Sequence, residues 1–200
     1  MTTFLCIRHG NCNPIGRYIA GRIEGIHLNR EGQEEVEALA DSLINIGIEK
    51  VFSSPLERAC ETAEIICRKI NLDYEIKHEL IEIDYGDWSG KTIEDLCRLT
   101  SWKQYNRQKS LTHVPNGEML IEIESRMAGF VEAIRRKYKG IVALISHGEP
   151  IKCLIAHYTG IPIDLIGRIE IDTASLTTLV LDDYNAQLLC LNYRGATRPV

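Results

Sequence analysis

The fold is decided by Ile141-Val142-Ala143-Leu144-Ile145-Ser146-His147-Gly148, a run of aliphatic residues that ends in Ser-His-Gly. Such a continuous apolar run is typical of a strand in the middle of a parallel sheet, where both faces are buried. Near the start of the chain, Phe4-Leu5-Cys6-Ile7-Arg8-His9-Gly10 has the same character and also ends in His-Gly. Chance readily places one histidine at a strand end, but two strand ends of this form indicate a shared site.

Helical patterns follow the strand at Phe4–Ile7 and the next strand that we expect along the chain, at Lys50–Phe52. Asn29 has the side chain of a helix N-cap, apolar residues recur after it at helical spacing, and Gly47 is expected as the C-terminal cap. Ser53-Ser54-Pro55 is expected to open another helix, which extends to about Lys69. Its proline would lie near the first turn, where the missing N–H costs nothing.

A longer helix precedes the buried strand at Ile141–Ile145. It is predicted from Glu118 to Gly140, because apolar residues recur there every three or four positions. The other expected elements are strands at Lys50–Phe52 and Tyr74–Lys77, a turn-rich segment at Gly86–Thr92, a helix at about Pro150–Tyr158, and late strands at Ser175–Leu181 and Gln187–Tyr193. This alternation predicts a three-layer α/β/α sandwich, with a mostly parallel central sheet and helices on both faces. We expect residues 1–200 to form this single domain.

Composition and charge restrict the class of protein. The formal net charge of −5 gives no general reason to bind nucleic acid or an anionic membrane, although a local pocket can still be positive. No apolar run reaches the roughly 18 residues that a membrane helix needs, and the N-terminus lacks the basic start of a secretory signal. The seven cysteines are an odd number and are scattered, which favours free thiols in a reducing compartment. We therefore expect a cytoplasmic protein.

In sheets of this kind, ligands bind beyond the carboxyl ends of the strands, and the candidate residues gather there. Arg8 ends the first strand, and Arg58 lies in the first turn of the helix that follows the second. Arginine offers paired donors to phosphoryl oxygens, and a helix N-terminus adds free N–H groups. His9 is suited to attack phosphorus and form a phosphohistidine, because a neutral imidazole is a nucleophile. His147, in its protonated form, would hold the oxygens of the transferred group.

Phosphoryl transfer also requires a group that protonates the leaving oxygen and later accepts a proton from water. Three acids lie beside the turn-rich segment: Glu82, Asp84 and Asp87. Glu82 lies between two isoleucines, and apolar surroundings favour the protonated form of a carboxyl group. The residues alone therefore favour Glu82 but leave Asp84 and Asp87 open.

Several motifs, in order along nearly the whole chain, resemble the histidine phosphatase superfamily, the broad family that includes the cofactor-dependent phosphoglycerate mutases. Arg8-His9-Gly10 is similar to its signature triplet, and Ser146-His147-Gly148 is similar to its last motif. The other matching stretches are Leu28-Asn29-Arg30-Glu31-Gly32-Gln33, Ser53-Ser54-Pro55-Leu56-Glu57-Arg58-Ala59 with Thr62-Ala63, Leu80-Ile81-Glu82 with Tyr85-Gly86-Asp87-Trp88-Ser89-Gly90, and Pro115-Asn116-Gly117-Glu118.

The resemblance implies a three-layer α/β fold, a phosphohistidine intermediate on His9, and catalysis without a metal or other cofactor. It selects Glu82 as the acid that later acts as base. It completes the catalytic set with Arg8, Arg58 and His147.

The loop after the first triplet departs from the family's pattern. Many members have an acid, a threonine and then an asparagine that contacts phosphate, whereas this chain has Asn11-Cys12-Asn13-Pro14. Asn13 is therefore a displaced candidate for substrate binding, and Gly148 is assigned to substrate binding beside it. The mutases that the chain resembles are also longer, with extra segments that retain the phosphoryl group, which favours transfer to water here.

The expected function is thus hydrolysis of a small phosphomonoester by a histidine acid-type phosphatase. One alternative is a phosphotransferase of the phosphoglycerate mutase type, and another is a non-catalytic regulatory binding protein on the same scaffold. The expected partner is a small phosphorylated metabolite, with no nucleic acid and no membrane. Pairing of the late strands into a homodimer is left open.

Two further patterns carry weaker hypotheses. The spacing Cys6-x-x-His9-x-x-Cys12 is typical of some metal sites, but Cys6 lies in an apolar strand, so a core cysteine is the better interpretation. The stretch Thr100–Val114 has no acid and three basic residues, namely Lys103, Arg107 and Lys109. One hypothesis is that it covers the site and receives a second anionic or planar part of the substrate. The simpler interpretation is a solvated helix and loop.

Overall fold

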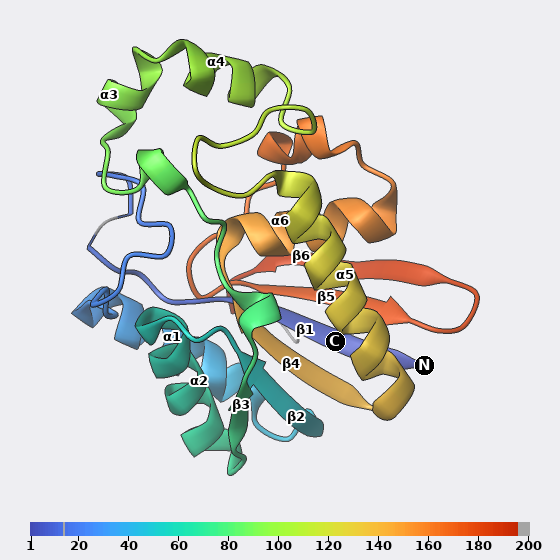
Figure 1. Ribbon diagram of the computed structural model, residues 1–200. Coiled ribbons are helices and arrows are strands. Elements are labelled where there is room, and N and C mark those ends of the chain that lie inside the picture. The colour runs from blue at the N-terminus through green and yellow to red at the C-terminus, as the bar shows by residue number, and fades with distance from the viewer. Residues whose placement is uncertain (14, 196–200) are drawn as a thin grey trace.

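A six-stranded sheet forms the middle layer of the protein in a computed structural model that describes residues 1–13 and 15–195 (Figure 1). Pro14 and residues 196–200, which belong to the expected domain, lie outside the described residues. The strand order is β3-β2-β4-β1-β5-β6. The strands are β1 (Thr2–Arg8), β2 (Ile48–Ser53), β3 (Tyr74–Ile76), β4 (Ile141–Ser146), β5 (Leu176–Leu181) and β6 (Ala186–Tyr193). Strands β1 to β4 are parallel, and β5 and β6 are antiparallel to their neighbours.

Strands β4 and β1 lie in the middle of the sheet, and both of their faces are covered by helices. Along β1, Phe4 and Cys6 join a core with α5 (Leu120–Lys137) and α6 (Gly148–Thr159). The alternate residues Leu5 and Ile7 join a second core with α1 (Arg30–Leu43) and α2 (Glu57–Ile70). Figure 1 shows the two helix pairs on opposite sides of the sheet. The three-layer sandwich with a mostly parallel sheet is therefore confirmed.

Helix α1 begins where the sequence predicts and ends earlier. Asn29 is its N-cap, and the side-chain oxygen accepts a hydrogen bond from the Gly32 N–H at 2.8 Å. The last helical residue is Leu43, so the prediction that Gly47 caps this helix is wrong. The chain leaves the helix sooner because Asn45 adopts a left-handed conformation, with φ of 64°. Gly47, with φ of 86°, instead directs the chain into β2.

Helix α2 starts two residues after Pro55, whereas the sequence suggested a start at that proline. Leu56 is the N-cap, and Glu57 is the first helical residue. Ser54, just after the end of β2, is still hydrogen-bonded to the sheet, because its N–H donates to the Ile145 carbonyl at 3.0 Å. Residues 54–56 are therefore needed to carry the chain from the sheet edge into the helix.

The long helix α5 lies between Glu118 and Gly140 as predicted, but it is shorter at both ends. Glu122 caps its start, since the carboxylate accepts a hydrogen bond from the Met119 N–H at 2.7 Å. The segments between β3 and α5 contain two 3₁₀ turns, at His78–Leu80 and Gly86–Trp88, and a third lies at Ile163–Arg168. The late strands form the expected hairpin, with β5 and β6 antiparallel.

Two short helices, α3 (Ile93–Cys97) and α4 (Thr100–Arg107), form an extension at the top of Figure 1. Trp102 and Tyr105 of α4 pack against the buried Trp88, with ring centroids 5.1 and 5.3 Å away. This aromatic group fixes the extension to the segment that carries the candidate acids. No helix within the described part of the chain is long and apolar enough to cross a membrane.

Candidate active site

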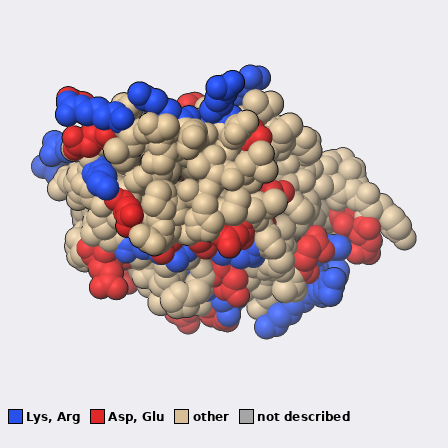
Figure 2. Space-filling model, turned by 45° about the horizontal axis from the view of Figure 1, so that its top comes forward, with Lys and Arg blue, Asp and Glu red and all other residues tan. Residues whose placement is uncertain are grey.

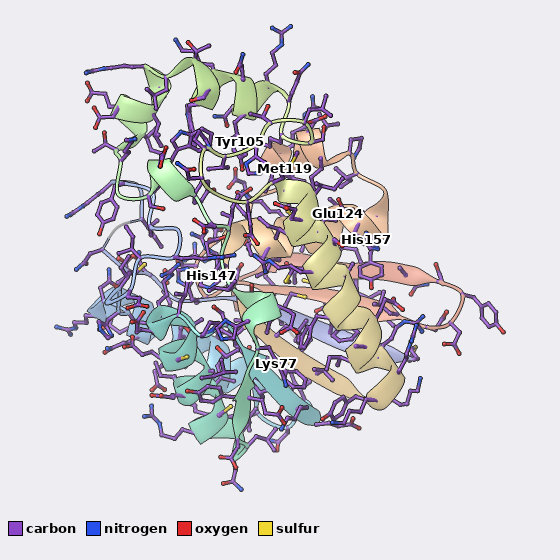
Figure 3. The ribbon with its side chains drawn as sticks, viewed as in Figure 1. Lys77, Tyr105, Met119, Glu124, His147 and His157 are labelled. Atoms are coloured by element: carbon purple, nitrogen blue, oxygen red, sulfur yellow. The ribbon has the colours of Figure 1, made fainter. Side chains whose placement is uncertain are left out.

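The carboxyl ends of the parallel strands bring the candidate residues together. Arg8 on β1 pairs in register with Ser146 on β4, so the histidine that follows each of them emerges at one edge of the sheet. The ring centroids of His9 and His147 are 5.1 Å apart. Figure 3 shows His147 near the middle of the molecule, below Tyr105 of the α4 extension. The predicted meeting of the two His-Gly strand ends is thus observed.

His9 is held in one tautomer by its neighbours. Its Nδ1 lies 2.8 Å from the Gly10 carbonyl oxygen, which can only accept, so Nδ1 carries the proton. The other ring nitrogen, Nε2, accepts a hydrogen bond from Arg58 Nε at 3.3 Å. Burial, together with the positive charges of Arg58 and Arg8, lowers the pKa of His9 well below its ordinary value. The ring is therefore neutral, with the lone pair of Nε2 on the side of the guanidinium of Arg58.

The two arginines are anchored by backbone carbonyls, and each retains an unused donor. Arg58 is almost fully buried, and its Nη2 donates to the Gly21 carbonyl at 2.8 Å. Arg8 Nη1 donates to the Ile171 carbonyl at 2.5 Å. Arg58 Nη1 and Arg8 Nε are buried nitrogens without a hydrogen-bond partner among the described residues. A buried donor without a partner is costly, which suggests that both are reserved for a ligand.

His147 is held by Ser54 and is electrically neutral in this environment. Its Nε2 lies 2.7 Å from Ser54 Oγ, whereas Nδ1 is buried with no partner in the described chain. Burial, then the charges of Arg58 and other neighbours, lowers the pKa of His147 well below its ordinary value. This differs from the expectation of a protonated ring. A phosphoryl dianion between these groups would offset the neighbouring positive charges and favour a proton on His147.

Glu82 is the acid of the three that reaches the cavity. Burial raises the pKa of its carboxyl group to about 7, against the opposing effect of Arg58. Asp84 instead accepts a hydrogen bond from the Gly86 N–H at 2.8 Å, and the exposed Asp87 accepts from Asn116. Neither aspartate lines the cavity within the described structure. The geometry therefore favours Glu82, in agreement with the motif that selected it.

An open cavity of about 210 Å³ lies over these groups. Of the predicted residues, Arg8, His9, Arg58, Glu82 and Gly148 line it. Its other lining residues are Cys12, Ile15, Gly16, Tyr18, Ile19, Ala20, Gly21, Tyr85, Glu149 and Lys152.

Asn13 is not brought into this cavity. Its side chain is exposed and lines a separate hollow, with its Oδ1 3.5 Å from Asn29 Nδ2. Among the described residues 11–13, Cys12, which is buried, does line the cavity. Cys6 packs in the core on the α5 face. Within the described residues, no group of three or more histidine, cysteine or acidic side chains is placed to hold a metal ion.

The basic stretch 100–114 also lies outside the cavity lining as far as the structure describes it. Lys103 and Arg107 are exposed, while the Lys109 ammonium lies 4.2 Å from the ring centroid of Tyr105. The idea that Lys103 and Arg107 receive part of the substrate therefore gains no support from this arrangement. Figure 2 shows basic and acidic side chains mostly around the margins of the face that it presents, with uncharged residues over much of its middle.

Sequence reasoning missed two charged residues of the cavity, Glu149 and Lys152. Both lie in the first turns of α6, directly after His147. Lys152 Nζ is 3.4 Å from Glu149 Oε1, and Glu149 Oε2 is buried without a hydrogen-bond partner among the described residues. The sequence signal that could have identified them is their position, because both follow a strand-end histidine and lie one helical turn apart. The role of Ser54 as the hydrogen-bond partner of His147 was likewise not predicted, although Ser54 lies in one of the matching motifs.

The chain is similar in sequence to several known proteins. The family model of the histidine phosphatase superfamily (branch 1) matches residues 4–194. Phosphoserine phosphatase 1 of Hydrogenobacter thermophilus is 26% identical over 197 residues, which cover 96% of this chain and 92% of that protein. A probable phosphoglycerate mutase, GpmB of Proteus mirabilis, is 27% identical over 180 residues, covering 86% of this chain and 81% of that one.

Solved structures share the fold. The structure of YhfR from Bacillus stearothermophilus has a TM-score of 0.88 and 23% identity, and covers 94% of this chain and 96% of that one. The alpha-ribazole phosphatase from Shigella flexneri has a TM-score of 0.84 and 24% identity, with coverage of 96% and 97%.

Proposed function

This chain belongs to the histidine phosphatase superfamily, branch 1, and on that premise we propose that it is a metal-independent phosphatase acting on a small phosphomonoester. The observation that carries the proposal is the group of unused polar atoms around His9. Arg8 Nε, Arg58 Nη1 and His147 Nδ1 are all buried without a hydrogen-bond partner in the described chain. A phosphoryl group has three equatorial oxygens that need such donors.

The first step is attack by His9 on phosphorus. The lone pair of Nε2 forms the P–N bond while the ester P–O bond breaks, and the Glu82 carboxyl gives its proton to the leaving oxygen. Because the pKa of Glu82 is raised to about 7, a large fraction is protonated at neutral pH. The hydrogen bond from Nδ1 to the Gly10 carbonyl stabilises the positive charge that develops on the ring.

The second step returns the enzyme to its starting state. The Glu82 carboxylate takes a proton from water, the water oxygen attacks phosphorus, and the P–N bond breaks with its electrons returning to Nε2. Arg8, Arg58 and His147 hold the three oxygens through both steps, with a proton on His147 when the dianion is bound. Catalysis is then mainly positioning and electrostatic stabilisation.

The substrate's alcohol would lie against Glu149 and Lys152. The Glu149 oxygen that has no partner among the described residues requires a donor, and Lys152 offers an ammonium group whose contact with Glu149 Oε1 is long, at 3.4 Å. An alcohol that carries both an ammonium and a carboxylate suits this pair. Phosphoserine, which the relative from Hydrogenobacter thermophilus is named for, is such a compound.

The test is phosphate release from a panel of phosphomonoesters in the presence of a chelator. The panel comprises phosphoserine, 3-phosphoglycerate, glycerol phosphate and 4-nitrophenyl phosphate, and the comparison is with His9→Ala and Glu82→Gln. We expect turnover that survives the chelator, disappears in His9→Ala and, for the alkyl esters, falls strongly in Glu82→Gln. Phosphoryl exchange between phosphoglycerates with little phosphate release would instead indicate the mutase. If no phosphate is released and no phosphoryl group is found on His9, the result would indicate the binding protein.

A further inference from the structure

Glu118 occupies the centre of an ion-pair network behind the proposed acid. Its Oε2 lies 2.7 Å from Arg22 Nη2, and its Oε1 lies 3.4 Å from Arg126 Nε. The same carboxylate accepts a hydrogen bond from the Asp84 N–H at 3.1 Å. All three charged side chains are substantially buried, with exposed fractions of 22% for Glu118, 18% for Arg126 and 31% for Arg22. Such a network is worth more than an exposed ion pair.

The two arginines hold the backbone on which Glu82 lies. Arg22 Nε donates to the Glu82 carbonyl at 2.9 Å. Arg126 donates from Nη2 to the Ile81 carbonyl at 2.7 Å and from Nη1 to the Glu79 carbonyl at 2.5 Å. The segment between the 3₁₀ turns is in neither helix nor strand, so no regular backbone ladder fixes it. Beyond the buried side chains of Leu80 and Ile83, its position is therefore fixed by hydrogen bonds to its carbonyls, of which the two arginines supply those at Ile81 and Glu82.

The network also reaches the loop that forms one wall of the cavity. Arg22 follows Gly21, whose carbonyl accepts the hydrogen bond from Arg58 Nη2 at 2.8 Å. The loop residues that line the cavity are Ile15, Gly16, Tyr18, Ile19, Ala20 and Gly21. A single carboxylate thus connects the cavity loop, the acid's backbone and the helix α5, on which Arg126 lies.

Charge also ties Glu118 to both arginines. Its carboxylate pairs with the two guanidinium groups that contact this segment, whereas the other acid near Arg22, Asp84, lies farther off, with its Oδ2 3.8 Å from Arg22 Nη1. Loss of the Glu118 charge therefore weakens proton donation by freeing the segment that carries Glu82.

We propose that Glu118 is a positioning residue for proton transfer, which holds Glu82 through Arg22 and Arg126 at the place where the leaving oxygen is protonated. The inference rests on the proposed function, in which Glu82 is the acid. It goes beyond that function because Glu118 does not line the cavity in the described structure and touches no reacting atom.

The test compares two leaving groups. An alkyl phosphate such as phosphoserine needs a proton on its departing oxygen, whereas 4-nitrophenolate departs with little help. We expect Glu118→Gln to lower kcat about 10- to 100-fold on the alkyl ester, which is part of the rate enhancement that a general acid contributes. On 4-nitrophenyl phosphate, we expect kcat to fall less than about 3-fold.

The matched control is Glu122→Gln, four residues after Glu118 in the first turn of α5. The Glu122 carboxylate accepts from the Met119 N–H and is not bonded to residues 79–84 in the described chain. Both substrates should keep wild-type kcat in this variant. If Glu118→Gln does not fold, Arg22→Lys retains the charge but cannot make both contacts, and we expect the same selective loss.

The outcomes distinguish failure of the Glu118 proposal from failure of the proposed function on which it rests. If Glu118→Gln slows both esters equally, the network is only structural and the inference is wrong. If Glu82→Gln shows the selective loss and Glu118→Gln does not, the inference fails while the function stands. If Glu82→Gln itself shows no selective loss, then the assignment of Glu82 fails, and the inference fails with it.

Discussion

Replacing Gly32 with alanine tests how closely helix α1 packs on the loop that follows His9. A Cβ atom at position 32 would lie 2.1 Å from the carbonyl oxygen of Asn11 and 2.5 Å from its nitrogen. Both are backbone atoms, so no side chain can rotate away to relieve the overlap. An ordinary contact between carbon and oxygen is more than 3 Å, as the close-packing of interiors requires, so the helix and the loop must separate by about 1 Å.

The cost follows from this displacement. Overpacking of a core costs about 1–3 kcal/mol, which for a domain of this size lowers the melting temperature by about 3–10 °C. Asn11 lies two residues after His9, and a shift of about 1 Å in a catalytic group can lower kcat by up to about 100-fold. We therefore expect Gly32→Ala to lose both stability and activity.

Gly129→Ala is the matched control. Gly129 is also a helical glycine, in α5, but an added Cβ there meets no heavy atom within 4 Å. Alanine should stabilise this helix by about 1 kcal/mol and leave kcat unchanged. Thermal unfolding by circular dichroism and phosphate release measure both effects. A Gly32→Ala protein with wild-type melting temperature and kcat would refute the reasoning about α1 and the loop.

Three further outcomes are expected. For wild type, the rate on alkyl phosphates should fall about tenfold per pH unit above about 7, as the raised pKa of Glu82 requires, and Glu82→Gln should lack this dependence. Folding disfavours the ionised Glu82, so the free energy of unfolding of wild type should fall relative to that of Glu82→Gln as pH rises from the unfolded pKa of 4.5 through about 7, as urea unfolding at several pH values would show. His9 and His147, whose pKa values are lowered, contribute the opposite trend equally to both proteins and cancel in this comparison. Ser146→Ala removes the 2.7 Å hydrogen bond to the buried Leu80 carbonyl and should cost about 1–2 kcal/mol in urea unfolding, since the carbonyl loses its partner.

Much of the fold was accessible from the sequence because the strongest signals are local. The aliphatic run Ile141–Ile145 and the N-cap Asn29 depend only on nearby residues, and both behave as predicted. The ends of elements were less accessible. Leu43 ends α1 because Asn45 takes a left-handed conformation, and the simpler expectation of a glycine cap at Gly47 overlooked that an asparagine can do the same.

The residues of the site likewise differ in how far the sequence predicts their positions. The meeting of His9 and His147 followed from the topology, since parallel strands end at one edge. The network of Glu118 did not follow, because Arg22 is 96 residues away and reaches Glu118 only through the path of an irregular loop. The loop around Asn13 was misleading for the same reason, as its side chain faces a different hollow from the one over His9.

The measurement that tests the central claim most directly is detection of the covalent intermediate. The protein would be mixed with phosphoserine or 4-nitrophenyl phosphate, quenched within milliseconds at alkaline pH, where phosphohistidine survives, and digested for mass spectrometry. The account predicts one added phosphoryl group on the peptide that contains His9, and none in His9→Ala. Turnover by wild type with no such adduct, or a phosphoryl group on another residue, would contradict it.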